Sequence, residues 1–328
     1  MKVAVVVPNW NGEPLLARCL DSLSRQTMPV DVIVADNGST DASVQIAAER
    51  GAQVLELGRN TGFTGAVNAG IAAALEQGAD YVLLLNNDAT AEPTWVEALV
   101  SAAERDPLAA VVAGKLVQPG PERLLDSAGS GYSTWGFPFP RGRNEVDSGQ
   151  YDGPVAEEIA TVTAGATLYR AAALRDISVF DDDFFAYYED DDICFRARLR
   201  GWRVLYEPRA VVEHEIAATS SRLGDLRSFH MVKNFFLLFH KNMPGRLWWR
   251  HLPSFVIGWL WFSAITARDG DRRAVLRAWW WTVKHLPATR AKRRSIQQRR
   301  SATDAEIGRL LLHAPPPTSR LGRRLARR

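Results

Sequence analysis

The chain has 328 residues, which is enough for one large or two moderate domains, each with its own hydrophobic core. Its hydrophobic (46%) and charged (23%) fractions are ordinary for a globular protein, and two distant cysteines, Cys19 and Cys194, exclude a disulfide framework and favour a reducing compartment. The net charge of +3 is unevenly spread: residues 220–328 carry 23 Lys/Arg against 5 Asp/Glu, and residues 1–219 carry 17 against 32, so we expect two parts with different partners.

The first half of the sequence alternates strands and helices. Short apolar runs predict strands at 3–7, 32–35, 52–57 and 81–85, and helical periodicity predicts helices at 14–24, 41–50 and 65–77. This order predicts an α/β fold with a mainly parallel, doubly wound sheet. The opening apolar run stops at Pro8, so we interpret it as a buried strand rather than a signal peptide and expect a cytoplasmic protein.

Polar loops follow all four predicted strands, with the sequences PNWNG, DNGSTD, GRNTGFTG and NNDA. Any one of them is explained by the turn-forming preference of Asn, Asp and Gly. Ligands of open α/β sheets bind at the carboxyl ends of the strands, where all four loops should meet. The set therefore predicts a ligand site at that edge of the sheet.

The middle of the chain is less regular. Residues 118–154 are rich in Gly and Pro and predict a mobile flap or binding loop. A strand-like stretch follows at 159–170, and two short extended segments are expected at 203–208 and 210–214. From about residue 222 the pattern becomes helical, aromatic and basic.

Four consecutive acids, at positions 189–192, lie within the sequence FFAYYEDDDICFRARLRGW (184–202). A helix starting near Asp190 would place Phe195, Leu199 and Trp202 on one face. Asp191 and Asp192 then have structural explanations, since first-turn acids suit the positive helix end and Asp192 lies four residues before Arg196. Glu189 and Asp190 lie at the helix start, where a side chain can project into a cleft, so one of them is the candidate functional acid.

Two further carboxylates follow predicted strands. Asp88 lies after the fourth strand, where a hard cation such as Mg²⁺ or Mn²⁺ can be shared with a diphosphate. Asp36 lies after the second strand, where an acid can accept hydrogen bonds from a ribose or a base edge.

The sequence resembles the family 2 inverting glycosyltransferases, which have the GT-A nucleotide-sugar-binding fold. The resemblance rests on VVVPNWN (5–11), VADNGSTD (34–41), RNTGFTGAVNAG (59–70), LLLNNDA (83–89), TAGATLYR (163–170), the acidic segment 180–202 and YEPRAVVEH (206–214). These motifs span most of residues 1–214 in the family's order. The tail, with KNFFLLFHKNMP (233–244) and AKRRSIQQRR (291–300), is similar to rhamnosyltransferase-type members.

The resemblance implies a role for each matching position. Asp190 would be the general base, with Glu189 beside it, and Asp88 and His214 would be metal ligands. Asp36 would contact the nucleobase, and the first acid of the family's DXD motif is replaced here by Asn86. The implied nucleotide-sugar pocket consists of Pro8, Asn9, Asn11, Asp36, Asn60, Gly62, Asn68, Asn86 and Asn87, and the sugar or acceptor border of Thr163, Ala164, Gly165 and Trp202.

These roles imply one reaction. Asp190 would take the proton from an acceptor hydroxyl as it attacks the anomeric carbon of a nucleoside-diphosphate sugar, and a Mg²⁺ or Mn²⁺ ion would act as a Lewis acid. Glu189 would raise the proton affinity of Asp190 by like-charge repulsion. Adjacent acids also suit a retaining hydrolase, although phosphate-type loops make hydrolysis the poorer interpretation.

The basic C-terminal part predicts membrane association. Residues 222–300 hold 7 of the 11 tryptophans, interleaved with Arg and Lys, a composition that suits an anionic membrane surface. The apolar run 253–267 is shorter than the roughly 20 residues needed to span a bilayer, so it is interfacial, re-entrant or a buried helix. An ordinary packed helical pair is the alternative, and no motif supports nucleic-acid binding.

We therefore expect a catalytic domain over 1–221, a helical membrane-associating extension over 222–300 and a basic, disorder-prone tail over 301–328. The predicted protein is a metal-dependent glycosyltransferase on the inner face of the cell membrane, with a lipid-linked glycan acceptor and dTDP-rhamnose as leading donor. A nucleotidyltransferase and a non-catalytic sugar-nucleotide-binding protein remain as alternatives.

Overall fold

A mixed sheet forms the centre of the molecule in the computed structural model, which describes residues 1–215, 224–269 and 271–313. The strand order is β10-β12-β6-β11-β4-β1-β2-β3, with β5 paired to β12 and β7 to β6. The strands of this sheet are β1 (Val3–Asn9), β2 (Asp31–Asp36), β3 (Gln53–Glu56), β4 (Tyr81–Leu85), β5 (Ala89–Ala91), β6 (Ala109–Val117), β7 (Leu125–Ser127), β10 (Glu157–Glu158), β11 (Ala166–Arg170) and β12 (Arg203–His214).

The first four strands pair in parallel, as their near-continuous apolar sequences predict. The carboxyl ends of β1, β2 and β4 therefore meet at one edge, where their polar loops follow. The pair β6 and β12 is also parallel, whereas β11 runs antiparallel between β4 and β6. This arrangement confirms an α/β fold with the predicted parallel core, to which antiparallel strands are added on one side.

Helices cover both faces of the sheet. Apolar side chains of α1 (Glu13–Leu23), α2 (Ser43–Glu49) and α4 (Trp95–Arg105) pack in one core cluster. Those of α3 (Gly62–Glu76), α5 (Ala171–Ile177) and α6 (Glu189–Leu199) pack in a second cluster on the opposite face. Because each face of the sheet is buried by helices, the strands carry apolar side chains on both sides.

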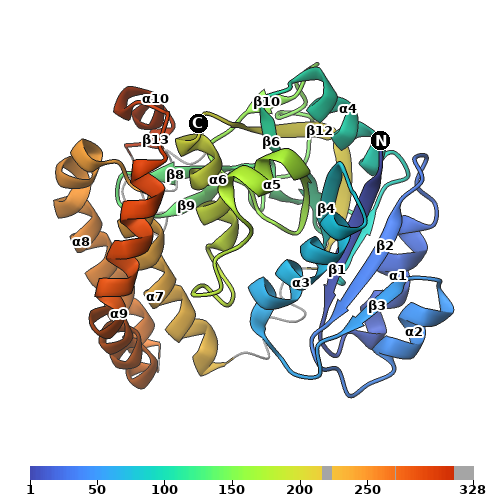
Figure 1. The fold of residues 1–328 in the computed structure, drawn as a ribbon, viewed down its shortest axis with the longest axis horizontal. Helices are drawn as coiled ribbons and strands as arrows, with labels where there is room; N and C mark the ends of the chain where they lie inside the picture. The colour runs from blue at the N-terminus through green and yellow to red at the C-terminus, as the bar shows by residue number, and fades with distance from the viewer. Residues whose placement is uncertain (216–223, 270, 314–328) are drawn as a thin grey trace.

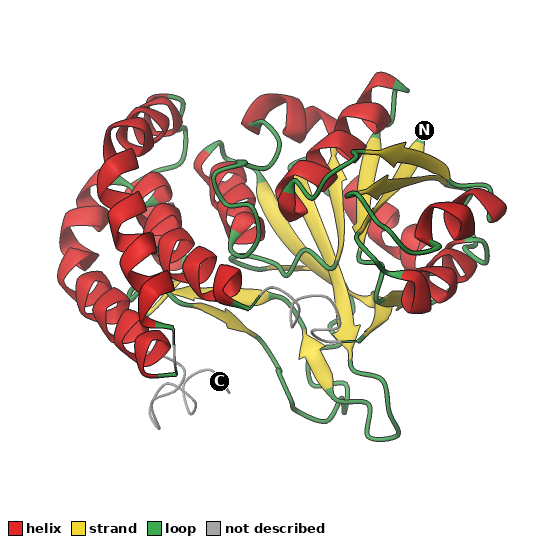
Figure 2. Ribbon diagram, turned by 90° about the horizontal axis from the view of Figure 1, so that it is seen from below, coloured by secondary structure: helices red, strands yellow, loops and turns green. Residues whose placement is uncertain are grey.

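The C-terminal part forms a block of helices beside the sheet (Figure 2). It consists of α7 (Asp225–Asn242), α8 (Gly245–Arg268) and α9 (Arg272–Gln298). An aromatic core joins these helices to α6 and to the small sheet of β8 (Ser130–Ser133), β9 (Pro138–Pro140) and β13 (Leu311–Leu312). Among the described helices, none combines the length and apolarity that a bilayer crossing needs.

Four local predictions differ from the structure. Residues 118–154 hold β7, β8 and β9 with largely buried side chains between 125 and 139, so this part is packed and the mobile flap is wrong, whereas the alternative of a binding loop agrees with the cavity described below. The segments 203–208 and 210–214 are one strand, β12, with a register shift between Glu207 and Val211. Trp202 lies after α6 and packs with a different core cluster from Phe195 and Leu199.

The fourth difference concerns the tail that we expected from 301 onwards. Its first part forms α10 (Asp304–Arg309), which begins with a capping box between Thr303 and Glu306, and continues into β13. The buried side chains of Ile307 and Leu311 join the aromatic core. Ordered structure therefore continues past residue 300, and the prediction for 314–328 lies outside the described residues.

Candidate active site

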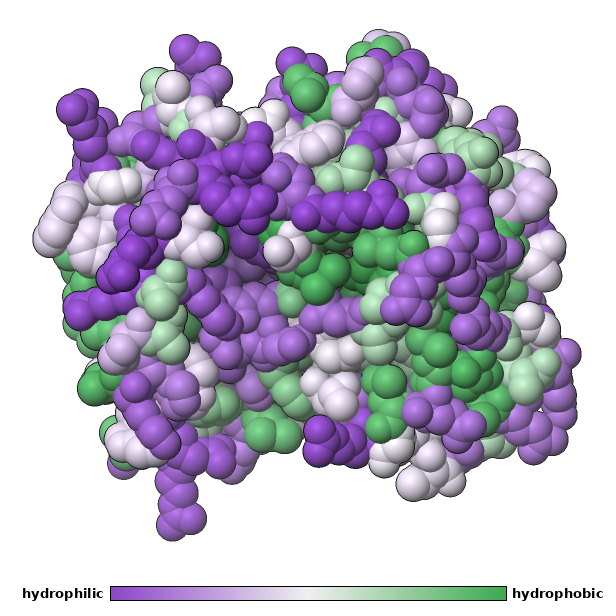
Figure 3. Space-filling view, in the orientation of Figure 1, coloured by the Kyte–Doolittle hydropathy of each residue, from purple (hydrophilic) through white to green (hydrophobic). Residues whose placement is uncertain are grey.

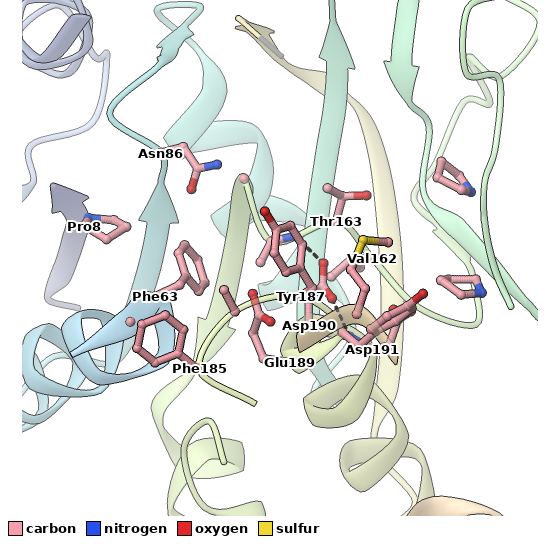
Figure 4. A pocket seen from close by; sticks show the side chains of 18 of the residues that line it. Pro8, Phe63, Asn86, Val162, Thr163, Phe185, Tyr187, Glu189, Asp190 and Asp191 are labelled. Atoms are coloured by element: carbon pink, nitrogen blue, oxygen red, sulfur yellow. Dashed lines mark hydrogen bonds between the residues drawn. The ribbon is translucent and has the colours of Figure 1, made fainter. Parts of the chain in front are cut away.

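A cavity of about 640 Å³ lies between the carboxyl edge of the sheet, the start of α6 and the helical block. Figure 4 shows Glu189 and Asp190 near the start of α6, with Asn86 following β4 and Thr163 preceding β11. The cavity brings together most of the predicted site residues: Pro8, Asn9, Asn60, Gly62, Asn86, Asn87, Asp88, Thr163, Ala164, Gly165, Glu189, Asp190 and His214.

Side-chain amides hold the first polar loops in place. Asn9 lies at the end of β1, where its Nδ2 donates to Asp36 Oδ1 at 3.1 Å and its Oδ1 accepts from Asn87 Nδ2 at 2.7 Å. These hydrogen bonds connect the end of β2, through Asn9 of β1, to the loop after β4. A Cβ at Gly12 would lie only 2.1 Å from Asn87 Nδ2. The loop after β1 therefore needs a glycine for the amides to meet.

The loop after β3 is tied to the loop after β2 in a similar way. Asn37 donates from Nδ2 to Asn60 Oδ1 at 3.1 Å and to the Gly62 carbonyl at 2.9 Å, and its Oδ1 accepts the Thr61 N–H at 2.7 Å. Gly62 has φ = +81°, and a Cβ there would lie 2.4 Å from the ring of Phe185. The glycine lets the start of α3 approach the loop that precedes α6.

Asp88, His214 and Asp126 form a buried row at the end of β12. His214 Nδ1 lies 2.9 Å from Asp126 Oδ2, and its Nε2 lies 3.3 Å from Asp88 Oδ1. Burial disfavours the imidazolium, but the hydrogen bond with Asp126 and the close carboxylate of Asp88 outweigh it and raise the pKa of His214 to about 9. The carboxylate of Asp126 fixes the ring so that Nε2 faces Asp88.

Asp88 and His214 suit a divalent cation. Asp88 Oδ1 is buried without a hydrogen-bond partner of acceptable geometry, and it faces the imidazole nitrogen that His214 presents to the cavity. Within the described residues, no group of three or more His, Cys, Asp or Glu side chains is arranged to hold a metal. Two protein ligands are nevertheless sufficient for Mg²⁺ or Mn²⁺ when substrate phosphates and water complete the coordination. The residues present therefore fit such an ion.

Asp190 lines the cavity at the start of α6, and two backbone N–H groups hold its carboxylate in place. Its Oδ2 accepts the Ala164 N–H at 3.1 Å and its Oδ1 accepts the Asp191 N–H at 2.8 Å. Burial nevertheless raises the pKa of Asp190, because desolvation outweighs these two donors. A carboxylate with a raised pKa and a fixed orientation is suited to accepting a proton.

Glu189 differs from Asp190 in its surroundings. Its Oε2 is buried without a hydrogen-bond partner. Burial, followed by the neighbouring charge of Asp190, raises its pKa well above the usual range. Charge repulsion between the two carboxyls acts on both of them and favours a proton on the pair. Burial is the largest cause of the raised pKa of both groups, and the added effect of Glu189 on Asp190 stays a prediction.

The loop before α6 has an unusual backbone that α7 holds in place. Phe185, Tyr187 and Tyr188 all have positive φ (65–72°), a conformation that is costly for side chains of this size. Asn234 of α7 donates from one amide nitrogen to the carbonyls of Phe184, Ala186 and Tyr187, at 2.8–2.9 Å. Asn234 is fully buried, so these bonds are shielded from water.

A cluster of buried charges attaches the same region to the helical block. Lys241 donates to Asp192 Oδ1 at 2.9 Å and also pairs with Asp181, which accepts from Lys292 at 2.6 Å. Although burial favours the neutral acid, Lys241 and Arg196 hold the pKa of Asp192 below its usual range. The helices therefore supply counter-charges to the segment that contains Asp181 and Asp192, and Asp192 has the structural role that its spacing from Arg196 predicts.

Four predicted site residues do not line the cavity as the structure describes it. Asp36 is 2% exposed and accepts hydrogen bonds from Asn9 and Ser39, so it supports the loop after β1, and its contact with a nucleobase stays a prediction. Asn11 accepts the Thr40 N–H. Asn68 bonds to Phe180 and Asp182, and Trp202 donates its indole N–H to Asp176 at 2.9 Å.

Several lining residues are absent from the sequence-based prediction. Asn37 was hidden among turn formers, and Arg143 falls in the segment expected to be a mobile flap or binding loop. Asp126, which orients His214 from outside the lining, falls in the same segment. The helical block adds an apolar wall made of Met231, Trp261, Phe262 and Ile265. The pairing of α8 with the sheet domain gives no signal in local sequence, so this wall could not be predicted.

The chain is similar to known proteins over most of its length. The model of the glycosyl transferase family 2 matches residues 4–178. The N-acetylglucosaminyl-diphospho-decaprenol L-rhamnosyltransferase of Mycobacterium tuberculosis is 31% identical over 268 residues, covering 75% of this chain and 86% of its own. The undecaprenyl-phosphate mannosyltransferase of Micrococcus luteus is 28% identical over 237 residues, covering 68% and 89%.

A solved structure supports the fold. The mannosyltransferase PcManGT from Pyrobaculum calidifontis, in complex with GDP-Man and Mn²⁺, superimposes with a TM-score of 0.52 at 16% identity. The match covers 93% of this chain and 84% of that one. The likeness therefore extends through both the sheet domain and the helical block.

Proposed function

Because the chain belongs to the glycosyl transferase family 2, we propose that it is an inverting glycosyltransferase that uses a nucleoside-diphosphate sugar as donor. The observation that carries this proposal is that the anchored carboxylate of Asp190 and the Asp88–His214 pair line one cavity. A proton acceptor and a cation site that share a cavity match the two needs of an inverting transfer.

Each group of residues has a separate role in this reaction. Asp190 accepts the proton of an acceptor hydroxyl while the hydroxyl oxygen forms its bond to the anomeric carbon and the bond to the diphosphate breaks. Ala164 and Asp191 keep its two oxygens oriented through their backbone N–H groups. Asp88 and His214 would hold Mg²⁺ or Mn²⁺, which when bound neutralises the charge that the departing diphosphate gains. Asn9, Asn37 and Asn87 keep the polar loops in place around the donor.

The acceptor that we propose is a lipid-linked glycan used in cell-surface polysaccharide synthesis. Support comes from the decaprenol-linked and undecaprenyl-phosphate substrates that the names of two relatives state. The rhamnosyltransferase is also the reason for dTDP-rhamnose as the leading donor. We place the reaction on the inner face of the cell membrane, with the enzyme attached peripherally.

A single assay separates this function from its alternatives. The purified protein is offered a panel of sugar nucleotides with Mn²⁺, with and without a prenyl-diphosphate-linked acceptor, and in parallel nucleoside triphosphates with sugar 1-phosphates, and the released nucleotide or pyrophosphate is identified. A glycosyltransferase releases a nucleoside diphosphate only when acceptor is present. A nucleotidyltransferase would consume a nucleoside triphosphate and release pyrophosphate, and a binding protein would retain the donor unchanged. Either of the last two results would overturn the proposal.

A further inference from the structure

The helical block exposes hydrophobic side chains that no described part of the chain covers. Of the 13 large hydrophobic residues that are exposed in the described structure, seven lie on just two helices, α8 and α9. On α8 these are Trp249, Val256, Ile257 and Leu260, and on α9 they are Leu276, Trp280 and Val283. Exposure reaches 71% for Trp249 and 73% for Val283. A soluble surface rarely gathers so many in one place without a partner.

These residues form one surface. On α9, Leu276, Trp280 and Val283 follow the i, i+4, i+7 spacing of a single helix face. The two helices are joined where Trp279 donates to Ser263 Oγ at 3.1 Å and where its ring meets that of Trp259 at a tilt, with ring centroids 5.5 Å apart. Val256 and Leu260 neighbour Trp259 on α8, just as Leu276 and Trp280 neighbour Trp279 on α9, so the exposed residues flank the contact on both helices. We call these seven residues the hairpin face.

The charged residues of the two helices that carry the hairpin face are all basic. The sequences of α8 and α9 contain 11 Lys/Arg and no Asp or Glu. Several of these cations are exposed next to the apolar residues, among them Arg250, Arg273 and Lys284. Lys284 Nζ lies 4.8 Å from the centre of the Trp280 ring. Figure 3 shows hydrophilic side chains over much of the near side of α9 and hydrophobic ones along the left edge, beside α8.

This combination selects one kind of partner. Apolar side chains flanked by Lys and Arg, with Trp at the boundary, fit the interface of a bilayer that contains anionic lipids. A second copy of the chain would bring two strongly cationic surfaces together, which like-charge repulsion opposes. We propose that the hairpin face docks the protein on the surface of an anionic membrane, with the axes of α8 and α9 parallel to the membrane plane.

Docking in this orientation has a consequence for the cavity. Trp261, Phe262 and Ile265, which line the cavity, belong to the same helix as Val256, Ile257 and Leu260 of the hairpin face. The membrane surface would therefore adjoin the apolar wall of the cavity, where the lipid end of an acceptor can enter. This last step rests on the proposed function, whereas the docking itself does not.

Vesicle sedimentation tests the proposal. The full-length protein is mixed with vesicles of phosphatidylcholine alone or with about a third phosphatidylglycerol, since surface attraction depends on anionic lipid and is screened by salt. We expect binding to the anionic vesicles only, with release at high salt. The variant Leu276→Glu/Val283→Glu should weaken binding by about tenfold or more, because it places two acids in the apolar stripe.

A matched control uses exposed valines elsewhere. Val146 and Val155 are 57% and 63% exposed on the sheet domain, so Val146→Glu/Val155→Glu adds the same charges and should bind vesicles as the unchanged protein does. Equal binding by the hairpin-face variant and the control would overturn the proposal, as would failure of the unchanged protein to bind anionic vesicles at low salt. Melting temperatures by circular dichroism check that both variants fold.

Two further readouts separate the possible failures. A concentration-dependent dimer that the hairpin-face variant converts to a monomer, without vesicle binding by the unchanged protein, would identify a second copy as the partner and overturn membrane docking. Nucleotide release with a water-soluble acceptor analogue reports on the proposed function alone. Vesicle binding without turnover of any donor would support membrane docking and refute the proposed transferase activity. Turnover without vesicle binding would support the transferase activity and refute membrane docking.

Discussion

His214 Nε2 lies 3.3 Å from Asp88 Oδ1, although the two residues are 126 positions apart in the chain. The pairing of β12 with β5 produces this relationship, because His214 is in register with Ala89, the residue after Asp88. Backbone hydrogen bonds of the sheet therefore set the distance between the two proposed metal ligands, and Asp126 sets the orientation of the imidazole ring.

The first prediction concerns Asp126. Asp126→Asn keeps the size of the side chain but removes the charge that holds His214 Nδ1, so Mn²⁺ affinity should fall by about 10–100-fold. Isothermal titration calorimetry on the protein without donor measures this directly. Glu122→Gln, an exposed acid from the same part of the chain, is the control and should bind Mn²⁺ as the unchanged protein does. Unaltered affinity in Asp126→Asn would contradict the orienting role.

The two acids at the start of α6 should respond differently to amide substitution. Asp190→Asn removes the proton acceptor and should lower the rate of transfer by about 10²–10⁴-fold, with donor affinity retained. Glu189→Gln replaces a carboxyl whose charged form is disfavoured by burial and whose Oε2 has no hydrogen-bond partner, so it should change the rate far less. Steady-state rates and donor titrations on both variants test the assignment. The opposite ranking would make Glu189 the base.

The pH dependence of transfer should reflect the burial of Asp190. A general base acts in its charged form, so activity falls as the pH drops through the pKa of Asp190. Because burial raises that pKa, the acidic limb of kcat/KM should lie above the value of about 3.9 for an unperturbed aspartate. The profile is recorded at saturating Mn²⁺ at every pH. A rate that stays constant down to pH of about 4 would contradict the proposed base.

The amide of Asn234 should be needed for both stability and turnover. Asn234→Leu retains much of the volume but leaves three buried carbonyls without their donor, at a cost of about 1–3 kcal/mol or more in unfolding free energy. Because these carbonyls belong to the loop before Asp190, kcat should fall more than donor affinity. Urea unfolding and steady-state kinetics measure the two effects. A loss of stability with unchanged kcat would limit Asn234 to a structural role.

Lys241 should be required for folding. Lys241→Met removes the fully buried cation that Asp181 and Asp192 share, which leaves Asp181 with Lys292 and Asp192 with Arg196. Removal of one partner from a buried ion pair costs about 3–5 kcal/mol. Lys284→Met is the control, because Lys284 is exposed and pairs only with the ring of Trp280 in the described contacts. Unfolding curves of the two variants should therefore differ clearly. Equal stability would show that the buried charges do not attach the helices to the sheet domain.

The parallel half of the sheet and its loops were predictable because both depend on local sequence. The run Tyr81–Leu85 is buried on both faces and forms β4 as predicted, and the polar residues after it line the cavity. The run of four acids led to Glu189 and Asp190 as candidates, the family resemblance implied Asp190 as the base, and both residues line the cavity. Asn86, which stands where the family's motif has its first acid, also lines the cavity.

The remainder depended on contacts between distant segments. Asp126 and His214 meet only because β7 and β12 both pair with β6. The contact of Asn234 with the loop before α6 joins residues 47–50 positions apart across two structural units. Trp202 was assigned to the acceptor site from its position in a motif, and a hydrogen bond to Asp176 instead directs its indole elsewhere. Neither hydrophobic periodicity nor turn chemistry reports such partners.

Because the helices hold the loop before α6, they limit where the chain can be truncated or joined to another protein. The segment that matches the family model ends at residue 178, before Asp190 and before the lysines and the asparagine that hold its loop. A fragment that stops after β12 would retain the donor loops but lose every one of those supports. Chimaeras with other transferases should therefore exchange the sheet domain together with the helices through Gln298. If only one of the two parts were exchanged, the buried ion pairs between them would lose their matching partners.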